Sequence, residues 1–253
     1  MPLQTVEPKR LYRQIAEQLR ALITAGEFAV GSRLPAERDL AKQLGVSRPS
    51  VREALIAMEV EGWVEVRTGS GIYVLERQAL DSKGQTTKHG RIAADEWGPL
   101  ELIRARRVVE GEVAALAATQ ATDRHIAAMS QALDAMKTDT VRGVMPLNGD
   151  RAFHTAIVEA CDNVVLLETV QRFWDSRRSP MFERLVGYFE TAQSWRSAIR
   201  EHEAILTAIG ARDAAAARDA MHAHMDRHHT RFTVSWTKAQ TLAAPKKNRD
   251  AAR

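Results

Sequence analysis

Four side chains in the C-terminal half of this 253-residue chain are of types that bind a divalent metal. Asp150 and His154 are four residues apart, which places both on one face of a helix. His202 and His224 occur in later segments with helical spacing, REHEAILTAI and AMHAHMDRHH. A carboxylate and three imidazoles from three helices of a bundle could converge on one cation. Alternatively, these histidines are solvated or bonded to the backbone, and we expect this of the others: His89, His125, His222, His228 and His229.

Two arginines in the N-terminal third have positions that suit the reading of DNA. Arg48 and Arg52 are four residues apart, beside an apolar stripe formed by Val51, Leu55 and Met58. A helix that packs by one side and offers guanidinium groups on the other can enter the major groove. A merely solvated helix face explains these arginines less fully, because they flank a packing stripe directly after a turn.

The residues around these arginines predict a helix-turn-helix. Pro35 suits the first turn of a helix, and Gly45 stands where a helix end favours a left-handed residue. Ser47 can cap the next helix by accepting a hydrogen bond from a free backbone N–H. Apolar spacing from Leu11 to Ile23 predicts one more helix before this pair.

Directly after these helices, two short β-branched runs predict a hairpin. The runs are Trp63–Arg67 and Ile72–Leu75, and a Gly-rich turn joins them. We therefore predict a winged helix-turn-helix domain over residues 1–76. A polar, unperiodic linker is expected over residues 77–98.

The remainder of the chain is predicted to be helical over residues 99–236, with no candidate strand. The predicted fold class is thus mainly α, a winged helix-turn-helix domain followed by an all-helical bundle. Residues 237–253 form a basic tail that we expect to be disordered. This tail has five basic side chains against one acidic, which accounts for the whole formal net charge of +4. DNA affinity must therefore come from local placement of charge.

The composition indicates in which kind of cellular compartment the protein is found. The single cysteine, Cys161, excludes a disulfide framework and indicates a reducing compartment. The sequence has no signal-peptide pattern and no apolar run long enough to span a bilayer. We expect a soluble, cytoplasmic protein without a membrane partner.

The N-terminal third contains the runs LPAERDLAKQLGVSRPSVREAL, AMEVEGW and VEVRTGSGIYV. In these runs it resembles the GntR family of bacterial transcription regulators. This resemblance implies that five residues contact the phosphates or bases of the operator: Arg38, Ser47, Arg48, Arg52 and Gly69. Arg38 could instead pair with Asp39 or Glu37, and Gly69 could merely permit a turn conformation.

The helical half resembles the ligand-binding domain, abbreviated FCD, of the FadR subfamily of these regulators. The matching runs are RRVVE, DRAFHTAIVEACDN, EHEAILTAIGARD and AMHAHM. Members with this pattern bind a divalent metal, so the resemblance implies four ligands: Asp150, His154, His202 and His224. In several members an arginine on the first bundle helix holds a small carboxylate effector at the metal, and Arg106 occupies that place. Arg106 could also form an ion pair with Glu110, and the two roles can coexist.

A finer resemblance concerns the effector. The runs EPKRLYRQIAEQLRALITAGEFAVGSRLPAER, EVRTGSGIYV and WDSRRSPMFERL are similar to those of hexuronate-catabolism repressors. This similarity implies a hexuronate or a related sugar acid. The last run is shifted by one residue between its Trp and Pro-Met, so the resemblance assigns no specificity contact to Trp174, Arg177 or Arg178. Trp174 could equally be a core residue. Imidazole ligands favour zinc as the metal, with nickel, iron or manganese as alternatives.

Together these features predict a transcription regulator that binds a palindromic operator as a homodimer. We expect it to be a repressor whose affinity for the operator falls when its effector binds. Two other classes stay open. A metal-dependent hydrolase or lyase would need a general base, for which Glu203 beside His202 is the nearby candidate, although adjacent helix positions point apart. A nonspecific DNA-binding protein that relies on its basic tail would show no operator preference.

Overall fold

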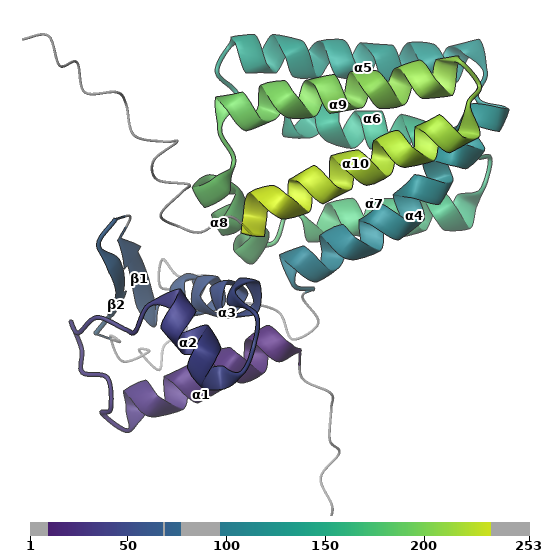
Figure 1. Ribbon diagram of the computed structural model, residues 1–253. Coiled ribbons are helices and arrows are strands. Elements are labelled where there is room, and N and C mark those ends of the chain that lie inside the picture. The colour runs from purple at the N-terminus through teal and green to yellow at the C-terminus, as the bar shows by residue number, and fades with distance from the viewer. Residues whose placement is uncertain (1–9, 68, 77–96, 234–253) are drawn as a thin grey trace, which may run out of the picture. The chain divides into compact units, whose positions relative to one another are not determined.

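The computed structural model describes residues 10–67, 69–76 and 97–233 (Figure 1). These residues fall into two compact units, one on each side of the segment between 76 and 97. The predicted linker over 77–98, apart from its last two residues, and the predicted tail over 237–253 lie outside the described residues.

The N-terminal unit has three helices followed by a hairpin. The elements are α1 (Leu11–Thr24), α2 (Glu37–Leu44), α3 (Arg48–Val60), β1 (Val64–Arg67) and β2 (Gly71–Val74). The strands are antiparallel, with Val64 opposite Val74 and Val66 opposite Ile72. This is the predicted winged helix-turn-helix.

Local signals in the sequence set the turn between α2 and α3. Gly45 ends α2 with a left-handed φ of 66°, a conformation that glycine adopts without steric cost. The backbone N–H of Ser50 donates to Ser47 Oγ at 3.2 Å and so caps α3. α3 packs against both other helices and β1, and Val51 and Leu55 are fully buried. The turn thereby fixes the direction in which the first residues of α3 face.

The second unit is all helical, as predicted. Its elements are α4 (Pro99–Gln120), α5 (Asp123–Val141), α6 (Leu147–Glu159), α7 (Val164–Ser176), α8 (Pro180–Phe189), α9 (Ala192–Gly210) and α10 (Ala214–Thr233). α5 packs against α6 and α9, while α4 contacts α6, α7 and α9 (Figure 1). No helix among the described residues is both long and apolar enough to cross a membrane.

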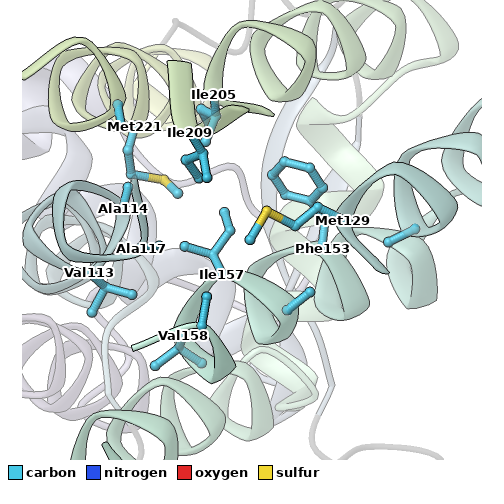
Figure 2. Close-up of a cluster of buried hydrophobic side chains, with 14 of the residues drawn as sticks. Val113, Ala114, Ala117, Met129, Phe153, Ile157, Val158, Ile205, Ile209 and Met221 are labelled. Carbon is cyan, nitrogen blue, oxygen red and sulfur yellow. The ribbon is translucent and has the colours of Figure 1, made fainter. Parts of the chain in front are cut away.

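The hydrophobic core of this bundle contains residues of the same helices that carry the predicted metal ligands. Figure 2 shows Phe153 and Ile157 of α6 among side chains from the neighbouring helices, including Met129, Ile205 and Met221. Burial of each such side chain contributes about 1.5–3 kcal/mol. Because Phe153 precedes His154 and Ile205 lies one turn after His202, the packing that stabilises α6 and α9 also fixes two of the predicted ligands.

Candidate functional sites

The structure brings the four predicted metal-binding side chains together inside the bundle. Asp150 and His154 come from α6, His202 from α9 and His224 from α10. Each is at most 4% exposed. One potential ligand atom from each residue lies within 4.8 Å of the others.

Hydrogen bonds on the outer side of the three imidazoles set their orientation. The Nδ1 of His202 donates to the carbonyl oxygen of Ala198 at 2.6 Å, and that of His224 donates to Glu201 Oε2 at 2.9 Å. The Nδ1 of His154 donates to the carboxylate of Glu110. Carbonyl and carboxylate oxygens can only accept, so the proton lies on Nδ1 in each ring. Each Nε2 therefore offers a lone pair, the arrangement common around protein-bound metals.

The inner side of the cluster brings several of these acceptor atoms close together. The Nε2 atoms of His154 and His202 lie 3.2 Å apart. Asp150 Oδ1 lies 3.0 Å from His202 Nε2, and within the described part of the chain no group donates a hydrogen bond to it. Lone pairs that face one another in a buried site repel, and a cation among them removes that repulsion. These residues therefore fit a divalent metal.

The protonation states in the cluster also suit metal binding. Burial by itself would raise the pKa of Asp150, but the guanidinium of Arg177 holds it well below its ordinary value. Burial lowers the pKa of His154 and His224. Metal ligands must be ionised carboxylates and neutral imidazoles, and the surroundings favour both forms.

Arg106 lies buried on α4 next to the cluster. Its Nε donates to Glu110 Oε1 at 2.6 Å, so the ion pair considered from the sequence is formed. Burial would raise the pKa of Glu110, but Arg106 and His154 lower it to about 2. The Nη1 of Arg106 is buried, and none of the described residues accepts a hydrogen bond from it. The pair with Glu110 uses Nε and Nη2, so it leaves the Nη1 donor unused.

Three further residues, Glu201, Arg177 and Trp174, contact the members of this site. Glu201 orients His224, and Arg177 donates to Asp150 Oδ2 at 2.9 Å. Both contacts join residues more than twenty positions apart, so helical spacing could not reveal them. Trp174 is buried, with its ring centroid 5.1 Å from that of His154 and 4.4 Å from the guanidinium carbon of Arg106.

The expectation that His228 is solvated or bonded to the backbone is wrong. His228 lies buried one turn after His224 on α10, with its Nε2 3.7 Å from Glu190 Oε1. Its position on the inner face of α10 follows from the four-residue spacing between His224 and His228.

His125 is bonded to the backbone, as expected. Its ring caps α5 by accepting a hydrogen bond from the backbone N–H of Thr122.

In the N-terminal unit, basic residues gather at a surface cavity of about 540 Å³. Arg38 and Arg48 line it from the starts of α2 and α3, and Gly69 lines it from the hairpin turn. Two more arginines contribute, Arg33 and Arg67. Three of the five predicted DNA-contact residues thus meet at one basic surface.

The other two predicted DNA-contact residues have clear structural partners. Ser47 caps α3 and is exposed beside Arg48. Arg52 is only 1% exposed, and its guanidinium forms two hydrogen bonds to Glu37, at 2.9 and 3.0 Å. The expectation that Arg52 faces outward with Arg48 is therefore wrong for this structure, because Glu37 at the start of α2 covers it. Glu37 also accepts from Arg48 Nε at 3.1 Å and so joins the two arginines.

This arrangement predicts different effects for two alanine substitutions. Arg52→Ala leaves Glu37 buried without its main partner and should lower the free energy of unfolding by about 3–5 kcal/mol. Arg48→Ala removes a half-exposed pair and should cost less than about 1 kcal/mol of stability, while weakening operator binding by about 1–3 kcal/mol if Arg48 reads a base. Thermal unfolding and fluorescence anisotropy with DNA separate the two effects. Equal stability of both variants would contradict the structural role of the buried Arg52–Glu37 pair.

Comparison with known families and proteins identifies a regulator family over each of the two units. Residues 101–227 match the FCD domain family, and residues 11–74 match the family described as "Bacterial regulatory proteins, gntR family". The Uxu operon transcriptional regulator of Escherichia coli (strain K12) is 36% identical over 221 residues, which cover 86% of this chain and 85% of the relative. The Exu regulon transcriptional regulator of the same strain is 34% identical over 227 residues, covering 88% and 85%. A solved structure, Streptococcus agalactiae GntR, is 24% identical with a TM-score of 0.45, covering 87% of this chain and 99% of that one.

Proposed function

Because this chain belongs to the GntR family of bacterial regulatory proteins and is a transcription regulator with an FCD domain, we propose that a small carboxylate effector, bound at the buried metal cluster, controls its hold on operator DNA. In this proposal residues 1–76 bind DNA and residues 99–236 bind metal and effector. Residues 77–98 link the two domains, and residues 237–253 are a basic tail.

We assign the metal to Asp150, His154, His202 and His224. The supporting observation is the set of inward lone pairs, including a buried carboxylate oxygen that has no donor. Three imidazoles and one carboxylate favour zinc, with nickel, iron or manganese as alternatives. When bound, the metal would supply a Lewis-acidic position that accepts a carboxylate oxygen.

Arg106 is assigned to the effector. The observation that supports this assignment is the buried Nη1 of Arg106, which no described residue pairs with. An unpaired buried donor of a charged group is costly, and a carboxylate at that point would satisfy it. The ion pair with Glu110 holds the guanidinium in place without using all of its donors.

A sugar acid is the proposed class of effector. The relatives named for the Uxu operon and the Exu regulon agree with the resemblance to hexuronate-catabolism repressors. A hexuronate has the required carboxylate together with hydroxyl groups that polar side chains can recognise.

At the DNA, we propose that a homodimer places two copies of α3 on a palindromic operator. Arg38, Arg48 and Gly69 would contact it directly from the basic cavity. Ser47 would contact it beside Arg48, and Arg52 would act either after release from Glu37 or by holding Glu37 and Arg48 in position. In this proposal the protein is a repressor whose operator affinity is weakened by the effector, and by linkage DNA weakens effector binding equally.

The position of Glu203 does not suit the general base that the enzyme alternative requires. The partly exposed side chain of Glu203 on α9 forms an ion pair with Lys137 of α5 at 2.9 Å, and it is not a member of the metal cluster. The matching families and relatives are transcription regulators rather than enzymes. A catalytic role for the metal cluster is therefore not proposed.

The test measures operator binding by metal-loaded and metal-free protein. A DNA site selected by the protein from a random pool serves as the operator, and D-glucuronate and D-galacturonate serve as effectors. We expect at least one acid to weaken binding by about 5–150-fold, the usual range of coupling between two sites, only when metal is present. Equal weakening after chelation would contradict the proposal, and failure to select any preferred sequence would favour nonspecific binding through the tail.

A further inference from the structure

The segment just before α2 runs beside the hairpin. Arg33 forms an antiparallel bridge with Tyr73 of β2. The backbone N–H of the next residue, Leu34, donates to the carbonyl oxygen of Ile72 at 2.8 Å. These backbone contacts hold Arg33 against the hairpin, so the direction in which its side chain leaves the backbone is fixed.

The side chain of Arg33 lies over β2 at Gly71. Gly71 has a φ of 130°, a conformation that residues with side chains rarely adopt. A Cβ added to Gly71 would collide with Arg33 Nε and would lie 3.0 Å from Arg33 Cζ. Because Gly71 has no side chain, the guanidinium has room to lie beside the turn of the hairpin.

Arg33 is one of four arginines that line the basic cavity of the N-terminal unit. Each of the other three is paired with a carboxylate: Arg38 with Asp39 at 3.3 Å, Arg48 with Glu37 at 3.1 Å and Arg67 with Glu65 at 2.8 Å. Arg33 is exposed, and no carboxylate among the described residues pairs with it. An anion from outside can therefore bind its guanidinium without breaking an ion pair.

The position of the cavity indicates which anion this is. The cavity lies between the start of α3 and the hairpin, and Arg33 lines it beside β2. The sugar-phosphate strands form the edges of the major groove, so a groove that receives the start of α3 places one strand over the cavity. Guanidinium groups around one cavity repel one another, and a phosphate among them relieves that repulsion.

We propose that Arg33 is a further DNA-contact residue, which binds a backbone phosphate of the strand that passes between α3 and the hairpin. Such a contact fixes the position of the protein on the duplex and carries no sequence information. Gly71 takes part indirectly, since it gives the guanidinium its place. This inference rests on the proposed function, because it takes from it that residues 1–76 bind DNA through α3.

The experiment measures binding of the full-length protein to its selected operator and to a scrambled duplex of equal length, by fluorescence anisotropy over a range of salt concentrations. Arg33→Gln should make the slope of log affinity against log salt shallower by about 0.9 per bound chain, because one phosphate contact is lost. At roughly 0.15 M salt this corresponds to about fivefold weaker binding per bound chain, on both duplexes. Arg33→Lys keeps the charge and should retain most of the slope.

Lys42→Gln provides a control that removes the same charge. Lys42 is exposed on α2 in the same unit and does not line the cavity. Its replacement should change the slope by less than about 0.3 per bound chain. Both side chains are exposed, so the thermal midpoint of each variant should stay within about 4 °C of wild type.

The outcomes separate this inference from the proposed function. An unchanged slope in Arg33→Gln, together with weaker binding by Arg48→Ala, would overturn the phosphate contact and leave DNA binding by residues 1–76 intact. An equal loss of slope in Lys42→Gln, or weakening by Arg33→Gln on the operator alone, would also overturn it, because the effect would then come from overall charge or from a base. Unchanged binding in both Arg33→Gln and Arg48→Ala would overturn the proposed DNA surface and this inference with it.

Discussion

Replacing His224 with alanine is expected to remove most of the metal from the protein. Wild type should purify with, or take up, about one equivalent of a divalent transition metal per chain, because four buried side chains converge on one position. Without His224 the site has two imidazoles and one carboxylate, and occupancy should fall to below about one tenth after dialysis against a weak chelator. His154→Ala and His202→Ala should have the same effect. Elemental analysis of the dialysed protein measures occupancy directly.

A matched control distinguishes loss of a ligand from loss of packing. His228→Ala changes a histidine that is as buried as His224 on the same helix, one turn away, but outside the metal cluster. It should keep its metal. Glu201→Gln should show an intermediate result, about 10–100-fold weaker metal binding, because it alters the group that orients His224 and leaves all four ligands in place. Full occupancy in a His202→Ala, His224→Ala double variant would exclude these residues as ligands.

Several helix ends could be predicted from the sequence because residues at those ends determine them. Ser179 caps α8 and Pro180 is its first residue, so residues at the helix itself mark where it begins. Gly45 and Ser47 likewise define the turn between α2 and α3. Such signals act between residues two to four positions apart, so they can be read without the tertiary structure.

The surroundings of the functional side chains could not be read in this way. The four-residue spacing places Asp150 and His154 on one face of a helix, but it does not identify Glu110, 44 residues before His154, as the group that orients its ring. Helical spacing places Arg52 beside the packing stripe, yet only the packing of α2 on α3 brings Glu37 over it. In both cases a buried charge is stabilised by a partner from another helix, and the choice of partner depends on how the helices cross.

The site therefore combines a predictable set of ligands with a less predictable charge network around them. Asp150 contacts Arg177, His154 contacts Glu110, and Glu110 contacts Arg106. A ligand that pairs with Arg106 thus meets a group already connected to the metal cluster through Glu110. This connection makes Arg106 the most informative position at which to separate effector binding from metal binding.

Arg106→Lys is expected to abolish the response to the effector while leaving the metal in place. Lysine keeps the positive charge that Glu110 needs in the buried site, but it lacks the planar fork that can bind both Glu110 and a carboxylate. The loss of charge-assisted hydrogen bonds should weaken binding of D-glucuronate by about 1.5–3 kcal/mol. The variant should consequently keep its operator at glucuronate concentrations that release the wild type. Calorimetry with the acid and anisotropy with operator DNA measure the two effects on the same preparation.

Arg107→Lys provides the control for this prediction. Arg107 is adjacent on α4, partly exposed, and paired with Asp226 at 2.6 Å, so the same substitution there leaves the metal cluster untouched. It should bind metal, acid and operator as the wild type does. Equal affinity for the acid in wild type, Arg106→Lys and chelated protein would mean that the effector binds elsewhere. Arg106, its pair with Glu110 and the metal would then serve only to hold α4, α6, α9 and α10 together, and the free Nη1 would need another partner.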